Sequence, residues 1–529
     1  MKKLIILLTA LLVLLSAFCL TACDTSSETT AEPSDTTAPA TTTAPTTEGE
    51  DVSGDYHISL QDGTSSFVTI YPMGANRKQD TGKIFTTALT ALRKAFKTCG
   101  YVGTYPIKDD LESEKTYEIL LGATNREAST IADTLEYGEA VIRTVGNKII
   151  IVGYDDRATA SAIHQFVAKY MSSGAGTVKI PKNLDEKVEI DLSISVETGM
   201  SYYDMAMEVW NSFNTKYWKN RWVQGTGWWD AAEVLETYID AYEATKDADI
   251  KNKMLQYATT FRQRNQADWT YNEYNDDITW AVIAYTRIYL LTGETSYLTI
   301  AKNNFDKMYA RAWDEKLGGG LYWRNDNQTK NACINCPAAI AACYLAEATK
   351  DESYYTKAIE VMDWVFENLY QSSGAIIDSY NLQGEKNTWA STYNQGTFIG
   401  ACNLLYQKTG EKDYYDKAYK AAEYAMAHLT SDGILNGEGN PSPDNKDLPG
   451  FKGILTRWLY RFAKDNNDYE ILLFLQANAA AAYQNRNASG LIWTEWKNKT
   501  PDVTLESDGY YVFGMSTAVA LMFNSIPWN

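Results

Sequence analysis

The chain has 529 residues, 45% hydrophobic and 22% charged, which is long enough for two or three globular domains. It carries 48 Lys and Arg against 67 Asp and Glu, a net charge of −19. This balance argues against nucleic acid or a polyanionic substrate as a partner, because phosphate binding needs a basic surface. With three histidines in the whole chain, a His-ligated metal site is disfavoured, and neither a metal nor another cofactor is expected.

Residues 1–23 predict an export signal. Two lysines follow Met1, an apolar run covers 4–20, and a small residue precedes the cleavage point. A transmembrane helix is the alternative, because the run approaches spanning length. The ending Leu20-Thr21-Ala22-Cys23 resembles the bacterial lipobox, and this resemblance implies a lipid on Cys23 that anchors the exported protein to the cell membrane.

Residues 24–52 predict a flexible acidic tether. The stretch from Asp24 to Asp51 contains ten Thr and seven acidic residues but no Lys or Arg, and it shows no apolar periodicity. Such a segment cannot bury enough apolar surface to offset the entropy lost on ordering. Removing the tether and the two N-terminal lysines leaves the remaining chain at −19 − 2 + 7 = −14, so the folded body is acidic too.

Residues 53–196 predict a small mixed α/β domain. Strands are expected at 67–71, 117–121, 140–143 and 148–152, the last two joined through Gly146-Asn147 as a hairpin, and helices at 86–96 and 158–170. Two short stretches, 118–126 and 153–159, resemble the domain that precedes the catalytic barrel in some hexosaminidases and α-glucuronidases. The domain contains no Trp, so we expect it to act as a spacer or packing domain rather than as a sugar binder.

Residues 197–529 predict a mainly α domain built from repeats. A short sequence pattern recurs at 292–301, 349–358 and 409–418, with weaker copies from 245 and 463. In this pattern Thr is followed by Gly or Lys, then by an acidic residue, and a few residues later by aromatic residues. About twelve helical runs start near 202, 228, 249, 276, 296, 332, 352, 395, 413, 451, 468 and 515. Twelve helices in six hairpins predict a closed (α/α)6 toroid, with an open helical solenoid as the alternative. The loops on one side of the hairpins are long and hold most of the Trp and Gly.

Asp276 and Asp277 are the candidate catalytic residues. They open a helix within an aromatic stretch that includes Trp269, Tyr274 and Trp280, and such rings can stack on sugar faces. Adjacent aspartates can place their carboxyl groups roughly 5–6 Å apart, which favours the double-displacement geometry of retaining glycosidases. A helix N-terminus lowers both pKa values, whereas like charges in a desolvated site separate them. Two acids that simply complement a helix dipole are the alternative.

Several motifs that follow one another along the chain strengthen the hypothesis that this domain is a carbohydrate-cleaving enzyme. They are Trp228-Trp229, Asp276-Asp277, Trp313-Asp314 with Gly318-Gly319-Gly320 and Tyr322-Trp323, Lys330-Asn331 with Asn335, Thr392-Tyr393-Asn394-Gln395-Gly396, and Phe451-Lys452-Gly453. In this pattern the region from about 200 onward resembles glycoside hydrolase family 76, the endo-α-1,6-mannanases with an (α/α)6 fold. The resemblance implies that Asp276 is the nucleophile and Asp277 the acid/base.

The same loops and helix starts supply candidates for substrate binding. One of the two adjacent tryptophans is expected in the core and the other in the groove, the glycines could form only a turn, and the lysine could be a solvated helix-start residue. The substrate-binding candidates are Trp228, Trp229, Tyr274, Trp280, Gly319, Trp323, Asn331, Asp378, Tyr393, Gln395 and Lys452.

The cysteines are read as packing residues. Cys333-x-x-Cys336 could suggest half of a zinc site or a redox motif, but no second Cys or His pair completes zinc and the pair opens a helix. Five cysteines remain after the predicted signal. This number is small for a chain of this length and cannot pair completely, so a disulfide framework is not expected.

The leading hypothesis is a monomeric, retaining endo-α-1,6-mannanase anchored outside a bacterial cell, acting on a neutral α-1,6-mannan. A non-catalytic glycan-binding lipoprotein is the first alternative, and the intact Asp pair argues against it. A different (α/α)6 glycosidase acting on uronides is disfavoured by the acidic body. Transglycosylation shares the covalent intermediate and is not separable from hydrolysis by sequence.

Overall fold

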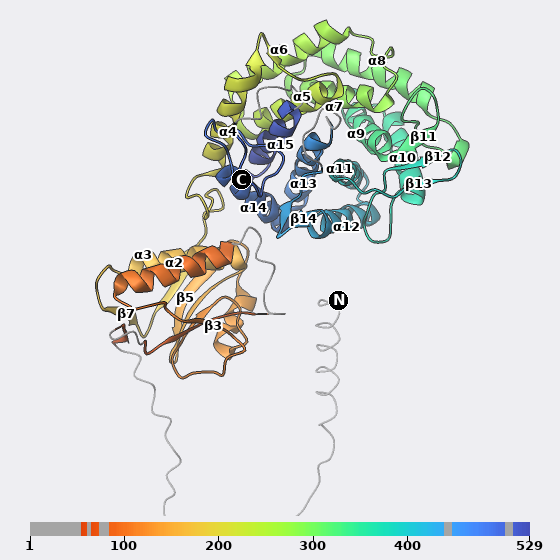
Figure 1. Cartoon of the computed structure of the whole chain (residues 1–529). Helices are drawn as coiled ribbons and strands as arrows, with labels where there is room; N and C mark the ends of the chain where they lie inside the picture. The colour runs from red at the N-terminus through yellow and green to blue at the C-terminus, as the bar shows by residue number, and fades with distance from the viewer. Residues whose placement is uncertain (1–53, 61–64, 74–83, 439–446, 503–510, 529) are drawn as a thin grey trace, which may run out of the picture. The chain divides into compact units, whose positions relative to one another are not determined.

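The computed structural model describes residues 54–60, 65–73, 84–438, 447–502 and 511–528. The predicted signal, with Cys23, and the predicted tether lie outside these residues. The described chain contains a small α/β part, from β1 to β8, and a helical part that begins with α4 (Figure 1).

The α/β part is built on a six-stranded sheet with the order β3-β2-β4-β6-β5-β8. The first three pairings in this order, β3-β2, β2-β4 and β4-β6, are parallel, whereas β5 is antiparallel to both β6 and β8. A separate antiparallel pair joins β1 and β7. The elements are β1 (Asp55–Ser59), β2 (Val68–Tyr71), α2 (Ile84–Cys99), β3 (Ile107–Asp109), β4 (Glu118–Leu121), η4 (Glu127–Thr134), β5 (Glu139–Val145), β6 (Lys148–Gly153), α3 (Asp156–Tyr170), β7 (Thr177–Pro181) and β8 (Asp185–Glu189).

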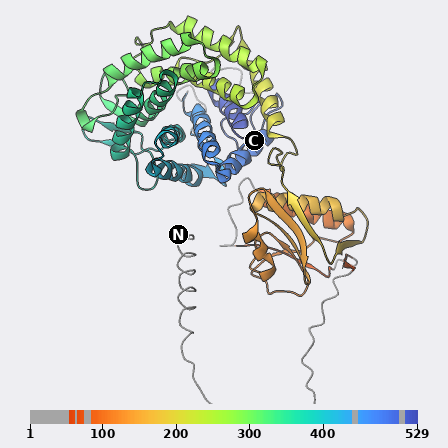
Figure 2. The ribbon, with the colours of Figure 1, turned by 180° about the vertical axis from the view of Figure 1, so that it is seen from behind.

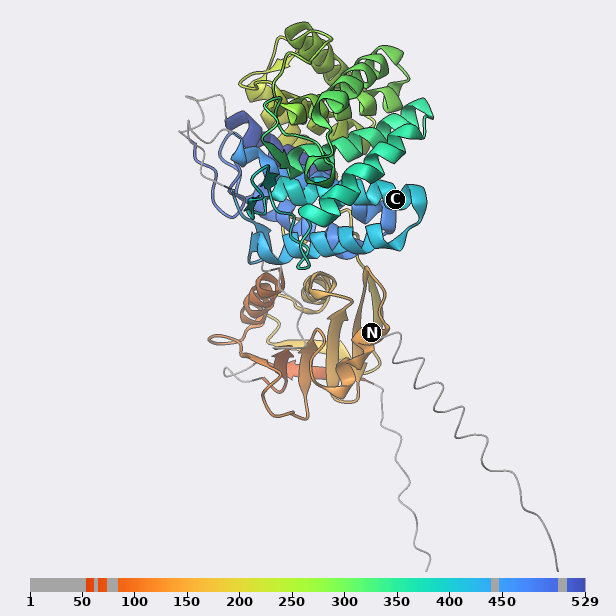
Figure 3. The ribbon, with the colours of Figure 1, turned by 90° about the vertical axis from the view of Figure 1, so that its right-hand side faces the viewer.

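Alternating side chains of this sheet form two apolar layers. Ile149 and Ile151 of β6 belong to the cluster that includes the buried faces of α2 and α3, which lie together on one side of the sheet (Figure 3). Ile150 and Val152 point the other way and pack with residues of η4. The predicted hairpin at Gly146-Asn147 and the predicted strands and helices of this region are confirmed.

The helical part contains twelve long helices, and each begins within four residues of its predicted start. Helix α9 is, in the described chain, the one helix long and apolar enough to cross a membrane, but it is buried inside the ring. The helices are α4 (Tyr202–Tyr217), α5 (Trp229–Thr245), α6 (Ala248–Asn265), α7 (Asn275–Thr292), α8 (Thr295–Ala312), α9 (Ala332–Thr349), α10 (Ser353–Asn368), α11 (Thr392–Thr409), α12 (Lys412–His428), α13 (Phe451–Asn466), α14 (Tyr469–Gln484) and α15 (Tyr511–Phe523).

These helices form two concentric rings, so the predicted (α/α)6 toroid is confirmed. The odd-numbered helices α5 to α15 contact one another in sequence, and α15 returns to contact α5, which closes the inner ring. Each even-numbered helix packs outside the ring (Figure 2). Because one antiparallel outer helix separates successive inner helices, all six inner helices run parallel and begin at the same end of the toroid.

The two ends of the toroid differ in their loops. Inner helices pass to outer helices through short turns in which the residue after the helix adopts a left-handed backbone, the geometry that Gly tolerates best. This explains the recurring Gly/Lys in the sequence. The left-handed residues are Lys246, Gly293, Lys350, Gly410 and Asn467.

Long loops return the chain from the outer helices to the starts of the inner helices. They contain the short strands β9 (Trp218–Lys219), β10 (Trp222–Val223), β11 (Thr329–Asn331), β12 (Ser379–Asn381), β13 (Lys386–Asn387), β14 (Thr430–Ser431) and β15 (Ile434–Leu435), and the turns η5 (Lys316–Gly318) and η6 (Leu448–Gly450).

A network of buried charges connects three inner helices. Arg287 of α7 donates to Glu236 (2.7 Å) and Asp240 (2.8 Å) of α5, and Arg457 of α13 donates to Asp240 (2.7 Å) and Glu233 (2.7 Å). Burial alone would raise the pKa of Asp240, but Arg457 and Arg287 lower it to about 2. Burial raises the pKa of Glu233 to about 7, so this carboxyl can take up a proton near neutrality.

Removing one cation from this network should strongly destabilise the toroid. Arg287→Met leaves buried carboxylates without their partner, so we expect the free energy of unfolding to fall by about 3–5 kcal/mol, measured by chemical denaturation. As a control, Lys302→Met removes half of the surface pair with Asp306 and should cost less than about 1 kcal/mol. Equal losses in the two variants would contradict a stabilising role for the network.

Candidate active site

Asp276 and Asp277 lie in the first turn of α7, where the long loops meet the inner ring. Asp276 is 9% exposed, whereas Asp277 is only partly buried. The two carboxylates therefore differ in solvent access although they are neighbours in sequence. None of the described cationic side chains forms an ion pair with either one, in contrast to the carboxylates of the charge network.

Two different loops supply side-chain hydrogen-bond donors to the two carboxylates. Trp323 Nε1 donates to Asp276 Oδ2 at 3.0 Å. Asn272 Nδ2 donates to Asp277 Oδ2 at 2.8 Å. Asp276 Oδ1 is buried and accepts no hydrogen bond within the described chain.

Burial dominates the protonation of the pair. It raises the pKa of Asp276 to about 7, although the Cys333 thiol and Trp323 act to lower it. Burial also raises the pKa of Asp277 well above its ordinary value, and the charge of Asp276 raises it further. The expected lowering of both pKa values by the helix N-terminus is outweighed, because no cation offsets the desolvation. The pair thus has two inequivalent members, as the like-charge argument predicts.

The starts of neighbouring inner helices complete the surroundings of the pair. Cys333, at the start of α9, lies between Asp276 and the hydroxyl of Tyr393 on α11. Tyr393 is buried and stacks on Phe451 of α13, with ring centroids 3.8 Å apart. All five described cysteines are free and buried, in line with the packing interpretation, but Cys333 also contacts the candidate nucleophile.

Two further carboxylates face Asp277. Asp230, in the first turn of α5, accepts hydrogen bonds from the backbone N–H of Gly227 at 2.7 and 2.9 Å, and burial raises its pKa to about 6. Asp447 accepts from Trp229 Nε1 at 3.0 Å. Their negative charges act to raise the pKa of Asp277. The site is therefore unsuited to an anionic sugar and compatible with a neutral one.

The loop that supplies Trp323 is held by a buried lysine. Lys330 Nζ donates to Asp314 Oδ1 (2.8 Å) and to the carbonyl oxygens of Asp314 (3.0 Å), Lys316 (2.7 Å) and Gly319 (2.6 Å). One ammonium thus binds four oxygens along a single loop, so the loop has a defined shape where it approaches the carboxylate pair.

Two glycines of this loop lie close to tryptophans, Gly319 to Trp313 and Gly320 to Trp364 of α10. A Cβ on Gly319 would lie 3.2 Å from Trp313, and a Cβ on Gly320 would lie 2.5 Å from the Trp364 ring. Gly319 is buried and its carbonyl binds Lys330. The structure therefore corrects the expectation that Gly319 is needed for a sugar to approach: its small size serves packing within the protein.

Three predicted substrate contacts are buried instead. Trp280 is 2% exposed and Lys452 is 1% exposed. Gln395 is fully buried, where it binds the backbone N–H and carbonyl of Ile376. Lys452 lies 3.9 Å from the centroid of Trp496 and donates to the Leu435 carbonyl. These side chains shape the protein beneath the site and present no face to a sugar in this conformation.

Other predicted residues do lie at accessible positions. Trp228 and Trp229 are both half-buried, so the expected division into a core and a groove residue is not sharp, but Trp229 packs on Trp280 and contacts Asp447. Tyr274 is half-buried and packs against Trp323, with centroids 5.3 Å apart. Asp378 is half-buried and accepts from Asn387. Asn331, in contrast, is buried, and its Oδ1 has no hydrogen-bond partner within the described chain.

Sequence reasoning missed residues that act through their neighbours. Asn272 lies four residues before the Asp pair, and Asp230 follows the Trp228-Trp229 motif, so proximity to known motifs was the available signal for both. Trp389, 42% exposed and 6.2 Å from Phe451, is a further aromatic ring at this end of the toroid. Arg311, on the outer helix α8, carried no sequence signal.

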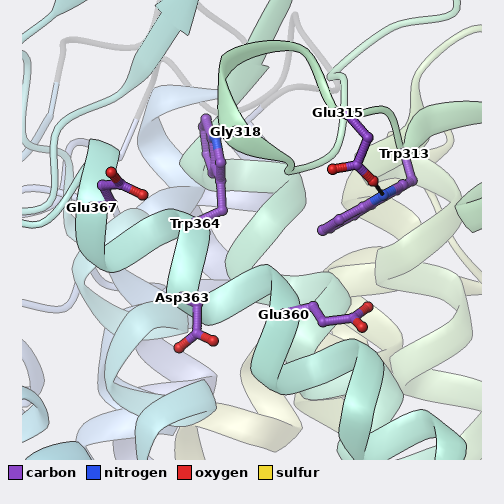
Figure 4. Close-up of a pocket in the computed structure, with 7 residues that line it drawn as sticks. All are labelled: Trp313, Glu315, Gly318, Glu360, Asp363, Trp364 and Glu367. Atoms are coloured by element: carbon purple, nitrogen blue, oxygen red, sulfur yellow. Dashed lines mark hydrogen bonds between the residues drawn. The ribbon is translucent and has the colours of Figure 1, made fainter.

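A pocket of about 340 Å³ lies between the Trp313 loop and α10. Figure 4 shows Trp313 and Trp364 beside it, with acidic side chains along α10. It contains none of the predicted catalytic residues. Among the described residues, no group of three or more His, Cys, Asp or Glu side chains could hold a metal ion; independence of metals stays a prediction.

A closed (α/α)6 ring with adjacent buried carboxylates at one end has the architecture of a glycoside hydrolase. Residues 191–525 match the sequence profile described as Glycosyl hydrolase family 76, and the protein belongs to that family.

Solved structures of this family are similar in fold and sequence. The GH76A α-1,6-mannanase of Salegentibacter sp. HEL1_6 is 31% identical with a TM-score of 0.55, over 61% of this chain and 99% of that one. An inactive variant of that enzyme, with two consecutive aspartates replaced by alanine, was solved with α-1,6-mannotetrose (29% identity, TM-score 0.56, covering 62% of this chain and 99% of that one).

Curated relatives are more distant. The mannan endo-1,6-alpha-mannosidase DCW1 of Candida albicans is 28% identical over 228 residues, which is 38% of this chain and 50% of that protein. DFG5 of Saccharomyces cerevisiae, with the same description, is 28% identical over 246 residues, 42% of this chain and 51% of that protein. The chain thus spans about half the length of these relatives.

Two glycine variants test the packing of the Trp323 loop. Gly318 and Gly320 both have positive φ values (82° and 85°), but a Cβ on Gly318 meets nothing within 4 Å. Gly318→Ala should cost about 1–2 kcal/mol of backbone strain. Gly320→Ala should cost about 1–3 kcal/mol more, because it clashes with Trp364. Chemical denaturation of both variants measures the difference, and equal losses would show that the close approach to Trp364 has no energetic weight.

Proposed function

We propose that the protein is an endo-α-1,6-mannanase that cleaves mannan by a retaining, double-displacement mechanism. The observation that carries this proposal is the pair Asp276 and Asp277: adjacent, free of cations, differently exposed and differently hydrogen-bonded. Membership in family 76 and the names of the relatives support α-1,6-mannan as the substrate.

The two carboxylates differ in the way that double displacement requires. Asp277 has the more strongly raised pKa and the better solvent access, so it holds a proton near neutrality and gives it to the departing glycosidic oxygen. Asp276, as the carboxylate, attacks the anomeric carbon and forms the glycosyl ester as the C–O bond breaks. Water then attacks this ester while Asp277 takes up the water proton, which restores both groups.

The surroundings suit a neutral polysaccharide. Asp230 and Asp447 add negative charge next to Asp277, which would repel a uronate. Half-buried aromatic rings such as Trp229, Tyr274 and Trp323 offer apolar faces to sugar rings. Long loops lie at this end of the toroid, which is compatible with an extended site and with cleavage inside a chain.

Asp276→Asn and Asp277→Asn should each abolish most hydrolysis of linear α-1,6-mannan while leaving the unfolding transition intact. Asp277→Asn should lose about 10²–10⁴-fold on mannan but keep turnover on an aryl mannoside with a good leaving group, because only acid catalysis is lost. Asp276→Asn should fail on both substrates, because it cannot form the ester. Reducing-end assays measure the first substrate and aryl release the second.

A matched control is available at the other Asp-Asp helix start in the chain. Asp156→Asn, in the first turn of α3, changes a paired aspartate outside the site and should keep full activity. Wild-type rates in either the Asp276 or the Asp277 variant would remove the assignment of the site.

We also propose that the protein is exported and anchored through a lipid on Cys23, as the lipobox resemblance implies. Cys23→Ala should move the protein from the membrane fraction to the soluble or secreted fraction without changing its activity, because the predicted tether separates the anchor from the folded body. Cell fractionation with immunodetection measures this, and membrane retention of the variant at wild-type levels would contradict the anchor.

A further inference from the structure

The proposed reaction needs the proton of Asp277 on the oxygen that faces the glycosidic bond. Asn272 Nδ2 donates to Asp277 Oδ2 at 2.8 Å. Oδ2 therefore already accepts an N–H donor, whereas the transferred proton must lie on the other oxygen. The orientation of the Asn272 amide is itself fixed, because its Oδ1 accepts from the Tyr274 backbone N–H at 2.9 Å. A flipped amide would present its NH₂ group to that N–H and its oxygen to the carboxylate, and would lose both bonds.

The segment that carries Asn272 is held from an outer helix by one arginine. Arg311, in the last turn of α8, donates from Nη1 to the Thr270 carbonyl (2.8 Å) and from Nη2 to the Asn272 carbonyl (2.7 Å). Its Nε donates to Asn275 Oδ1 at 2.7 Å. All three bonds end on the segment just before the Asp pair, and the planar guanidinium makes them in a fixed relative geometry.

Asn275 connects this segment to the loop that supplies the other donor. Its backbone N–H donates to the Trp323 carbonyl and its Nδ2 to the Tyr322 carbonyl, both at 2.8 Å. Trp323 in turn donates to Asp276. The donors for the two carboxylates are therefore held in one connected set of hydrogen bonds that Arg311 organises.

We propose, on the basis of the proposed mannanase reaction, that Asn272 and Arg311 are positioning residues for the acid/base: Asn272 binds Oδ2 of Asp277 so that Oδ1 carries the transferred proton, and Arg311 holds Asn272 in place. Neither residue is required to touch the substrate. Their role is to leave one defined oxygen of Asp277 free for the leaving group.

The charges around Asp277 give this arrangement a second consequence. Asp276 on α7, Asp230 on α5 and Asp447 before α13 all act to raise the pKa of Asp277, and Asn272 acts against them by stabilising the charged form. Loss of the Asn272 donor therefore raises this pKa further. Since activity at high pH ends when Asp277 loses its proton, the alkaline limb of the kcat/KM profile should move to higher pH.

Two Asn272 variants separate positioning from local folding. Asn272→Asp keeps an acceptor for the Tyr274 N–H but removes the donor and adds a negative charge, whereas Asn272→Ala removes both donor and acceptor. On linear α-1,6-mannan, kcat should fall about 10- to 100-fold in both variants with a smaller change in KM. The alkaline limb should move upward in both, and further in Asn272→Asp.

Arg311 has a matched control one turn earlier on the same helix. Lys307 also connects α8 to this region, through an exposed ion pair with Asp268 at 2.7 Å, but among the described residues it forms no hydrogen bond with Asn272 or Asn275. Arg311→Gln should lower kcat and move the alkaline limb in the same direction as Asn272→Ala, and Lys307→Gln should do neither.

The outcomes distinguish this inference from the proposed function. A wild-type protein that leaves α-1,6-mannan uncleaved would overturn the proposed function itself. An active wild type with an unchanged alkaline limb in Asn272→Ala and Asn272→Asp would overturn the positioning role. If Arg311→Gln fails to fold, the two Asn272 profiles still decide the question.

Discussion

The inner ring of helices is buried on every side, so each charge placed there must find a partner or shift its pKa. Along α5 and α7 the protein meets this constraint in two opposite ways. Arg457 and Arg287 surround Asp240 and hold its pKa at about 2, which keeps the carboxylate charged and structural. Asp276 and Asp277 receive N–H donors but no cation, and burial raises their pKa values. The absence of a cationic partner thus separates the proposed catalytic pair from the carboxylates of the charge network.

The two ends of the toroid differ in the length of their loops, and the Asp pair lies at the end with the long loops. Left-handed residues such as Gly293 and Gly410 reverse the chain at one end within a few residues, which leaves the long loops for the other. These loops are held internally: Lys330 binds the oxygens of the Trp323 loop, and Arg311 binds the segment before α7. A rigid first turn of α7 is therefore surrounded by loops of defined shape, which is the arrangement that positions catalytic groups well.

Much of the architecture could be predicted from sequence because it depends on the local spacing of apolar residues and on repeated turns. The twelve helix starts follow from apolar spacing and from the repeated turn at 292–301, and the Asp276-Asp277 pair is visible as an acid pair in an aromatic stretch. The directions of side chains at the helix starts are not local. Trp280, Gln395 and Lys452 belong to recognisable motifs, but whether they point to the cleft or into the core depends on neighbouring helices.

Long-range partners were likewise beyond sequence reasoning. Asn272 is near the pair, but its link to Arg311 depends on how α8 packs against the loop. Gly320 reads as a turn or a sugar contact until Trp364, more than forty residues later, is seen against it. Cys333 reads as a packing residue, and its contact with Asp276 exists only because α7 and α9 are adjacent in the ring.

The central claim is that Asp276 and Asp277 act as nucleophile and acid/base in a double displacement on α-1,6-mannan. The most direct test is proton NMR of linear α-1,6-mannan during the first turnovers, before the anomers of the new reducing ends equilibrate. Double displacement predicts that the α-anomer appears first and that the β-anomer forms only later, by mutarotation. Initial formation of the β-anomer would show inversion and contradict the assigned roles, and an unchanged polymer would contradict the substrate itself.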